Sequence, residues 1–266
     1  MLRSIATVSV PGSLPEKLTA IASAGFDGVE IFEDDLFSAA ETPAAIRHIA
    51  DSLGLTIFLF QPFRDFEGAP RARQADNLER ARRQFEVMHE LGCDRLLVCS
   101  NTQENCLADR EVQVADLAAL AQLAEEHDIQ LGYEALAWGK QVNHYGQAWE
   151  RVREVNSPAL GIVLDSFHIL SLGDTLDGLD EIPLEKISFL QLADAPRKQM
   201  DIQQWSRHFR CYPGQGDFAL LDFVTTLTRK GFCGPWSLEI FNDNLLPLDE
   251  GYRSLLELEA QMREQL

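Results

Sequence analysis

The sequence is short of cysteine pairs and of positive charge, and each shortage excludes a class of protein. Its five cysteines are odd in number and include no C-x-x-C pair, which argues against a disulfide framework or a structural zinc site. We therefore expect a reducing compartment, the cytoplasm. The 23 basic residues face 42 acidic ones, for a formal net charge of -19. Such a field repels phosphate backbones and anionic lipid, so we expect no nucleic-acid partner and no membrane partner.

Long apolar runs and flexible linkers are also missing. No stretch approaches the ~18 apolar residues of a membrane span, and the amino-terminal MLRSIATVSVPGS is typical of a first strand rather than a signal peptide. Without a low-complexity tract or a linker rich in Pro, Gly and Ser, we expect one catalytic domain over residues 1–266. The interval Met200–Phe218 is long for a structureless connection, which is typical of a functional lid.

What the sequence does contain is a repeated alternation of short apolar runs and stretches of helical spacing. The predicted strands are Ser4–Val10, Gly28–Phe32, Leu55–Phe60, Arg95–Cys99, Gln130–Glu134, Gly161–Asp165, Ile187–Gln191 and Trp236–Ile240. The predicted helices are Leu14–Ala24, Pro43–Leu53, Arg71–Leu91, Arg110–His127, Gly146–Val155, Phe218–Lys230 and Leu248–Gln265. This alternation favours a single α/β domain, a (β/α)8 TIM barrel. The alternative, an open doubly wound sheet, is disfavoured because VPGSLPEK lacks a G-x-G-x-x-G turn.

Polar side chains end four consecutive predicted strands, the fifth to the eighth. They are Glu134 in LGYE, Asp165 in GIVLD, Gln191 in ISFLQ and Glu239 in WSLE. The carboxyl ends of all strands of a parallel barrel meet on one face, where active sites are built. Carboxylates gathered there would repel one another unless they are protonated or bridged by a cation. The all-oxygen set therefore predicts one divalent metal ion, Mg²⁺, Mn²⁺ or Co²⁺, with Zn²⁺ less favoured.

A simpler interpretation of each acid is that it caps the helix that follows. Asp165 stands directly before SFHIL, and Asp is a good N-cap residue. For any one of the four residues both interpretations stay open. Their occurrence together at equivalent strand ends favours the metal site.

Two histidines follow these strand ends. His168 lies in the loop after Asp165, where an imidazole with an ordinary pKa near ~6.5 is useful for proton transfer. Its alternative is a structural histidine that packs under the loop. His144 follows Glu134 in the same strand's loop and would line the same mouth of the barrel.

Two arginines are candidates for binding an anionic group of a substrate. Arg64 follows the third predicted strand, and Arg210 lies in the long seventh loop. A guanidinium binds carboxylate or phosphate through paired hydrogen bonds. The alternative is an ion pair, of Arg64 with Asp65 or Glu67 and of Arg210 with Asp217.

Several motifs give the chain a family resemblance over essentially its whole length. AGFDGVEIFEDD, the strand-end glutamates, LDSFH and PGQGDF resemble the xylose-isomerase-like sugar phosphate isomerase/epimerase superfamily of barrels. Within it, the amino-terminal segment, LFQPFRDFEG and LQLADAP look closest to bacterial 3-dehydroshikimate dehydratases. Several members of that family carry an extra carboxyl-terminal domain similar to 4-hydroxyphenylpyruvate dioxygenase, so the chain could be a free-standing version or one domain of a fusion.

The resemblance implies a site and a reaction. The family's metal ligands, Glu, Asp, Gln and Glu, correspond to the four strand-end residues named above. The implied reaction is the dehydration of 3-dehydroshikimate, a small anionic substrate, to 3,4-dihydroxybenzoate in quinate and shikimate catabolism, through a metal-stabilised enediolate. We expect His168 to transfer protons, Arg64 and Arg210 to bind the carboxylate, and Ser206 and His144 to fix ring hydroxyls.

Two alternatives stay open at this stage. A sugar isomerase or ketose 3-epimerase would use the same metal site, with Glu134 and Glu239 as catalytic bases. A non-catalytic sugar- or polyol-binding barrel would not need the metal ligands. The apolar residues Leu36, Phe37, Leu245 and Leu246 could contact a second copy in a homo-oligomer or form a lid, and the sequence does not separate these.

Overall fold

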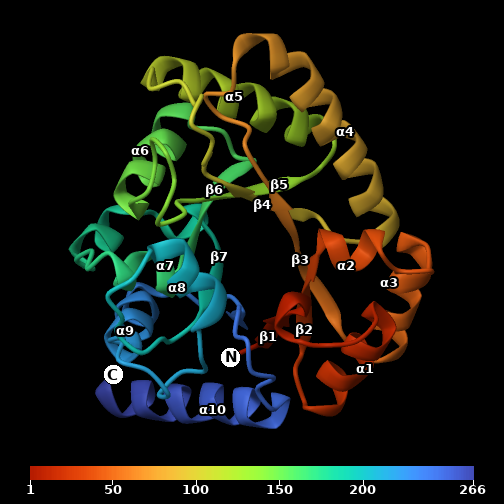
Figure 1. Ribbon diagram of the computed structural model, residues 1–266, viewed down its shortest axis with the longest axis vertical. Helices are drawn as coiled ribbons and strands as arrows, with labels where there is room; N and C mark the ends of the chain where they lie inside the picture. Colours follow the sequence, from red (N-terminus) through yellow and green to blue (C-terminus); the bar gives the residue numbers. More distant parts are fainter.

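Eight parallel strands close into a barrel in sequence order in the computed structural model, which describes residues 1–266. The strands are β1 (Arg3–Ala6), β2 (Gly28–Phe32), β3 (Thr56–Phe63), β4 (Arg95–Cys99), β5 (Gln130–Glu134), β6 (Leu160–Asp165), β7 (Ile187–Leu192) and β8 (Trp236–Leu238). The helices are α1 (Leu14–Ser23), α2 (Glu33–Phe37), α3 (Pro43–Ser52), α4 (Gln74–Leu91), α5 (Arg110–Glu126), α6 (Tyr145–Val155), α7 (Ser166–Ser171), α8 (Ile202–His208), α9 (Leu220–Lys230) and α10 (Leu248–Gln265). Figure 1 shows the helices arranged around the outside of the strands. The predicted (β/α)8 barrel is confirmed.

Most predicted boundaries agree with the structure to within a few residues, and two differences have clear causes. The first strand ends at Ala6 rather than Val10, because Thr7–Ser9 forms a 3-10 turn. The third strand continues to Phe63 rather than ending at Phe60. Its pairing with β4 passes from Phe60 directly to Phe63. Pro62, which has no N–H to donate, therefore lies in the strand without interrupting a hydrogen bond.

The interval 200–218, which is long for a structureless connection, does contain regular structure. It contains α8, which begins where the Asp201 side chain accepts a hydrogen bond from the Gln204 N–H at 2.9 Å. Further on, Cys211 forms an antiparallel bridge with Asp194, and Phe209 forms one with Asn242. The segment is thus a folded part of the barrel mouth.

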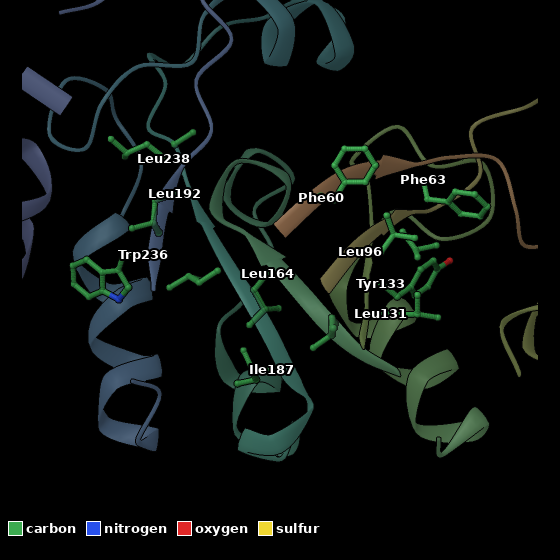
Figure 2. Close-up of a cluster of buried hydrophobic side chains, with 14 of the residues drawn as sticks. Phe60, Phe63, Leu96, Leu131, Tyr133, Leu164, Ile187, Leu192, Trp236 and Leu238 are labelled. Atoms are coloured by element: carbon green, nitrogen blue, oxygen red, sulfur yellow. The ribbon is translucent and has the colours of Figure 1, made fainter. Parts of the chain in front are cut away.

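The strands place alternate residues on the two faces of the barrel wall. Outward residues pack under the helices in a cluster of 64 buried residues, part of which Figure 2 shows along neighbouring strands. Inward residues form a separate small cluster that contains Leu59, Leu97, Val163 and Phe189. Because side chains alternate with a period of two, the residues two positions further along these strands also face inward, at the carboxyl end. This periodicity carries the polar strand-end residues into the mouth of the barrel.

Three surface features bear on the predictions about partners. None of the helices combines the length and the apolar character needed to cross a bilayer. Leu36 is buried, so the prediction that it contacts a partner or a lid is wrong. Phe37 and Leu245 are 58% and 75% exposed.

Candidate metal and active site

Four polar side chains gather at the carboxyl ends of β5 to β8. Glu134 and Asp165 are the last residues of β5 and β6, Gln191 is the last but one of β7, and Glu239 directly follows β8. Asp165 and Gln191 are register partners across two neighbouring strands. All four are at most 5% exposed. The structure therefore brings together the residues that the strand-end pattern singled out.

Two of these residues, Glu134 and Asp165, form a compact group with His168, in which each residue offers one ligand atom within 4.8 Å of the others. Glu239 is connected to this group by hydrogen bonds from neighbouring side chains. Its Oε1 accepts a hydrogen bond from Gln191 Nε2 at 3.3 Å, and its Oε2 accepts one from Arg210 Nη1 at 3.0 Å.

Two buried oxygen atoms in this group have no hydrogen-bond partner, Glu134 Oε1 and Gln191 Oε1. A buried polar atom left unpaired costs free energy comparable to a lost hydrogen bond or more. Burial raises the pKa of Glu134 well above its usual value, and the charges of Asp165 and Glu239 raise it further. Unpaired carboxylate and amide oxygens are the ligands that hard divalent cations prefer. The residues present thus fit one divalent metal ion.

The amide of Gln191 is held in one orientation by Glu30, at the inner face of β2. Gln191 Nε2 donates to Glu30 Oε2 at 2.6 Å, and Gln61 Nε2 donates to the same oxygen at 2.8 Å. Ser237 Oγ donates to the other oxygen, Oε1. With its nitrogen turned to Glu30, Gln191 must turn its unpaired oxygen away from that carboxylate. Glu30 is therefore a positioning residue that strand-end reasoning left out of the site.

Asp165 both caps the helix that follows it and faces the site, the two roles that the sequence left open. Its Oδ1 accepts a hydrogen bond from the Phe167 N–H at 2.7 Å and so caps α7. Its Oδ2 faces the site and accepts a hydrogen bond from Arg210 Nη1 at 2.8 Å. The cap fixes the carboxylate and aims its second oxygen inward.

His168 is fully packed, and its two ring nitrogens are distinguishable. Nδ1 accepts a hydrogen bond from the Ala137 N–H at 3.1 Å, and Nε2 lies 3.3 Å from Arg210 Nη2, which also donates to Ser206 Oγ. Because the backbone donor is fixed, we assign the proton of the neutral ring to Nε2. Burial lowers the pKa of His168 well below its usual value, and the charge of Arg210 lowers it further, so the ring is neutral. Nε2 lies 3.6 Å from Asp165 Oδ2. An Nε2 that carries a proton does not coordinate a metal, which makes His168 a hydrogen-bond donor at this site rather than a ligand.

Arg210 is a buried part of the acidic cluster rather than a free anion binder. Besides its bonds to Asp165 and Glu239, its Nε and Nη2 donate to Ser206 Oγ at 3.1 and 3.0 Å. Burial alone would lower the pKa of Arg210, but the charges of Asp165 and Glu239 outweigh this and raise it. Ser206 is also fully buried. The two residues brace each other, and Arg210 does not pair with Asp217 as the simpler alternative supposed.

Two other guanidinium groups stand at the mouth without an acidic partner. Arg64 and Arg207 line the narrow cavity over the site, together with Trp138 and Phe241. Arg207 lies over the Phe241 ring at 4.7 Å and over the Trp138 ring at 5.7 Å from the centroids. Neither arginine forms an ion pair within 4.0 Å, so the alternative of an Arg64 ion pair with Asp65 or Glu67 is not realised. Sequence reasoning missed Arg207, which lies in α8 three positions before Arg210.

His144 does not join the site. Its Nδ1 lies 2.6 Å from Asp174 Oδ1, its side chain is 44% exposed, and it takes the N-cap position of α6. A capping box with Gln147 holds it there. His144 is therefore not among the residues that line the narrow cavity over the metal ligands, and its contact with a ring hydroxyl stays a prediction.

Comparison with known proteins places the chain among similar barrels. A family model described as Xylose isomerase-like TIM barrel matches residues 18–263. A 3-dehydroshikimate dehydratase of Pseudomonas putida is 52% identical over 272 residues, which cover 100% of this chain and 43% of that protein. A solved structure described as a xylose isomerase-like TIM barrel/4-hydroxyphenylpyruvate dioxygenase fusion protein superposes with a TM-score of 0.97 at 52% identity, over 100% of this chain and 44% of that one.

A second solved structure, the IolI protein with a binding zinc atom, superposes with a TM-score of 0.87 at 20% identity, over 100% of this chain and 99% of that one. At that identity the likeness shows the fold alone. The chain spans less than half the length of the P. putida relative that it matches.

Proposed function

The chain belongs to the xylose isomerase-like TIM barrel family, and we propose that it is a metal-dependent hydro-lyase that dehydrates 3-dehydroshikimate to 3,4-dihydroxybenzoate. The observation that carries the proposal is identity of 52% along the whole chain to a 3-dehydroshikimate dehydratase. That relative favours dehydration over the isomerase and binding-protein alternatives. Residues 1–266 would then be one catalytic domain, acting in the catabolism of quinate and shikimate.

Glu134, Asp165, Gln191 and Glu239 would hold the metal. A divalent cation bound there would supply Lewis-acid polarisation of the substrate ketone and its neighbouring hydroxyl. Because His168 presents a protonated nitrogen, the ligand set is all oxygen. This chemistry favours Mg²⁺ or Mn²⁺, then Co²⁺, over Zn²⁺.

The substrate carboxylate would be bound by Arg64 and Arg207. These are the guanidinium groups at the mouth that lack an acidic partner, whereas Arg210 is already committed to Asp165 and Glu239. In a chain of net charge -19, two unpaired arginines at one cavity select an anion locally against the general field. Trp138 and Phe241 would form the apolar walls that keep water from the ring.

Proton transfer would be divided between Glu134 and His168. The substrate proton at C4 is acidic because it lies next to the C3 ketone. Glu134, at the end of β5, would accept it as the general base. Glu134 would return its proton to the C5 hydroxyl, which departs as water. The Nε2–H of His168 would donate a hydrogen bond to this leaving hydroxyl. Transfer of a C6 proton to the C3 oxygen then completes the aromatic ring, so one water leaves overall.

The test is an assay of metal-free protein with 3-dehydroshikimate, with and without added Mg²⁺, Mn²⁺ or Co²⁺, that follows the ultraviolet absorbance of the aromatic product. We expect product only with metal, and none from the Asp165→Asn variant. Absence of an aromatic product under every metal, from a folded protein that binds metal, would overturn the proposal. Interconversion of ketoses under those conditions would favour the isomerase instead.

The five cysteines are all unpaired, which suits a protein that works in a reducing compartment such as the cytoplasm. The proposed partner is the small anionic substrate.

A further inference from the structure

A second cavity opens beside the site, on the side of β3 and β4. It has a volume of about 430 Å³, against about 10 Å³ for the narrow space over the metal ligands. Arg64 lines both spaces, so they share one guanidinium. The volume is large enough for a small organic ligand.

The cavity wall is strongly cationic for a protein of such negative charge. Arg64, Arg73 and Arg80 line it, and none of them forms an ion pair with an acidic side chain. Arg80 donates one hydrogen bond, to the Arg64 carbonyl oxygen at 2.6 Å, and its guanidinium lies over the Phe63 ring at 4.1 Å. Three unpaired guanidinium groups around one space, in a chain of net charge -19, favour an anionic ligand.

The one acid of the wall, Asp65, does not neutralise these arginines. Its Oδ1 accepts hydrogen bonds from the Thr102 N–H and Oγ1, at 3.3 and 3.4 Å, and its Oδ2 accepts one from Gln103 Nε2 at 3.0 Å. The carboxylate is thereby held by the loop after β4. The charges of Asp65 and Glu33 still act on Arg80, but neither acid forms an ion pair with it, so its guanidinium can still bind a ligand anion.

The rest of the wall selects a polar molecule. Only one of the ten lining residues is hydrophobic, and amide side chains account for four. Asn77 is 6% exposed, and its amide makes no hydrogen bond within the chain. Amides that can both donate and accept suit ligand hydroxyls, whereas an apolar or aromatic ligand would find almost no matching surface.

We propose that this cavity is a second binding site, for a small hydroxylated carboxylate, held by Arg73, Arg80 and Asn77 and sharing Arg64 with the catalytic site. The shared guanidinium makes the two occupancies antagonistic, because one side chain serves only one anion fully. The proposal goes beyond the proposed dehydration and does not depend on it.

The test uses protein freed of metal and dialysed free of chelator, titrated with quinate in a calorimeter without phosphate or carboxylate buffer. Quinate is a hydroxylated carboxylate with no ketone, so neither turnover nor the metal site enters the measurement. We expect one quinate site on the wild type, weakened by added salt. We expect the Asp165→Asn variant to bind equally well.

The decisive variants differ in where the charge is removed. R73Q/R80Q should bind quinate at least about tenfold more weakly, since each lost charge-assisted hydrogen bond is worth about a factor of ten or more. R82Q/R83Q removes the same charge from exposed positions of α4 that do not line the cavity, and should bind as the wild type does. Asn77→Ala, which keeps all three arginines, should bind several-fold more weakly. Thermal melts of each variant establish that it is folded.

Failure of quinate to bind metal-free wild type would overturn the proposal. Equal weakening in the two double variants would overturn it too, because general charge would then explain the effect. The dehydration assay is independent of both results, so the two proposals fail separately.

Discussion

A buried acid lies on each face of β5, and the two acids have different surroundings. On the inner face, Glu134 lies among Asp165, Glu239 and Arg210, with Oε1 unpaired. On the outer face, the neighbouring Tyr133 donates from its hydroxyl to Glu67 Oε1 at 2.9 Å. Glu67 Oε1 also accepts a hydrogen bond from the Asn101 N–H at 2.6 Å, and its Oε2 is buried without a partner.

The difference between the faces is the number of charges that must be compensated. Burial raises the pKa of Glu67 to about 7, with a smaller contribution from the charge of Asp65, so one proton suffices to neutralise Glu67 itself. On the inner face only one guanidinium, that of Arg210, forms ion pairs with the three carboxylates, and protonating all of them would be costly. A buried acid with an unpaired oxygen therefore indicates a metal site only where several acids converge.

The most direct test of the difference between the two faces replaces each acid, Glu134 and Glu67, by its amide. Glu134→Gln should weaken metal binding severely and lower kcat/KM by about 10³ or more, because a ligand charge worth several kcal/mol is lost. Glu67→Gln should leave kcat/KM within about twofold of wild type. Calorimetric metal titration and steady-state kinetics measure both. Similar losses in the two variants would mean that the faces do not differ as described.

The inner face also holds the hydrogen-bond donor. His168→Phe keeps an aromatic ring but removes Nε2–H, and should lower kcat by about 10² while the metal dissociation constant is unchanged. His144→Phe is the matched control, and should retain near-wild-type kcat since His144 pairs with Asp174 outside the site. A large loss of metal affinity in His168→Phe would contradict the tautomer assigned from the Ala137 contact.

Glu30 tests whether the layer beneath the metal ligands positions them. In Glu30→Gln the new amide can donate an N–H to Gln191. The side chain of Gln191 can then turn its oxygen, rather than its nitrogen, toward position 30. We expect metal affinity to fall about 10–100-fold, as for other outer partners of metal ligands, with the melting temperature of metal-free protein near that of wild type. Unchanged affinity would remove Glu30 from the site.

The raised pKa of Glu67, on the outer face, should make the stability of the protein depend on pH. A carboxyl whose pKa is about 7 when folded and 4.5 in its ordinary state binds more protons in the native protein between those values. Stability should therefore fall as pH rises through that window, by at most about 1.4 kcal/mol per pH unit. Denaturant unfolding of wild type and Glu67→Gln, without metal, measures this. The variant should show a shallower fall, and parallel curves would count against the assignment.

The barrel and the strand-end cluster followed from local sequence. An apolar run that ends in a polar residue fixes its own face by period two, so Glu134, Asp165 and Gln191 could be placed without knowing their neighbours. Their convergence needed only the rule that parallel strand ends meet.

What sequence could not supply was pairing across the ring. Glu30 and Gln191 are 161 positions apart along the chain, and only the closed barrel brings them into contact. The tautomer of His168 depends on a backbone N–H of another loop. His144 was misplaced because sequence distance from Glu134 says nothing of the capping box and the Asp174 contact that turn it away. Ser206 lies in α8, which the sequence did not predict, and Arg210 lies just beyond the end of that helix, where its guanidinium reaches Ser206 Oγ.

The cap that Asp165 provides to α7 makes one backbone amide a built-in reporter. The Phe167 N–H is hydrogen-bonded to the same carboxylate that faces the site, through the other oxygen. Any cation that draws electron density from Asp165 will weaken that hydrogen bond, and any that fixes the carboxylate will slow the opening of the first turn. The Phe167 amide resonance should therefore shift on metal titration, and its hydrogen exchange should slow, which gives a spectroscopic readout of site occupancy that needs neither substrate nor turnover.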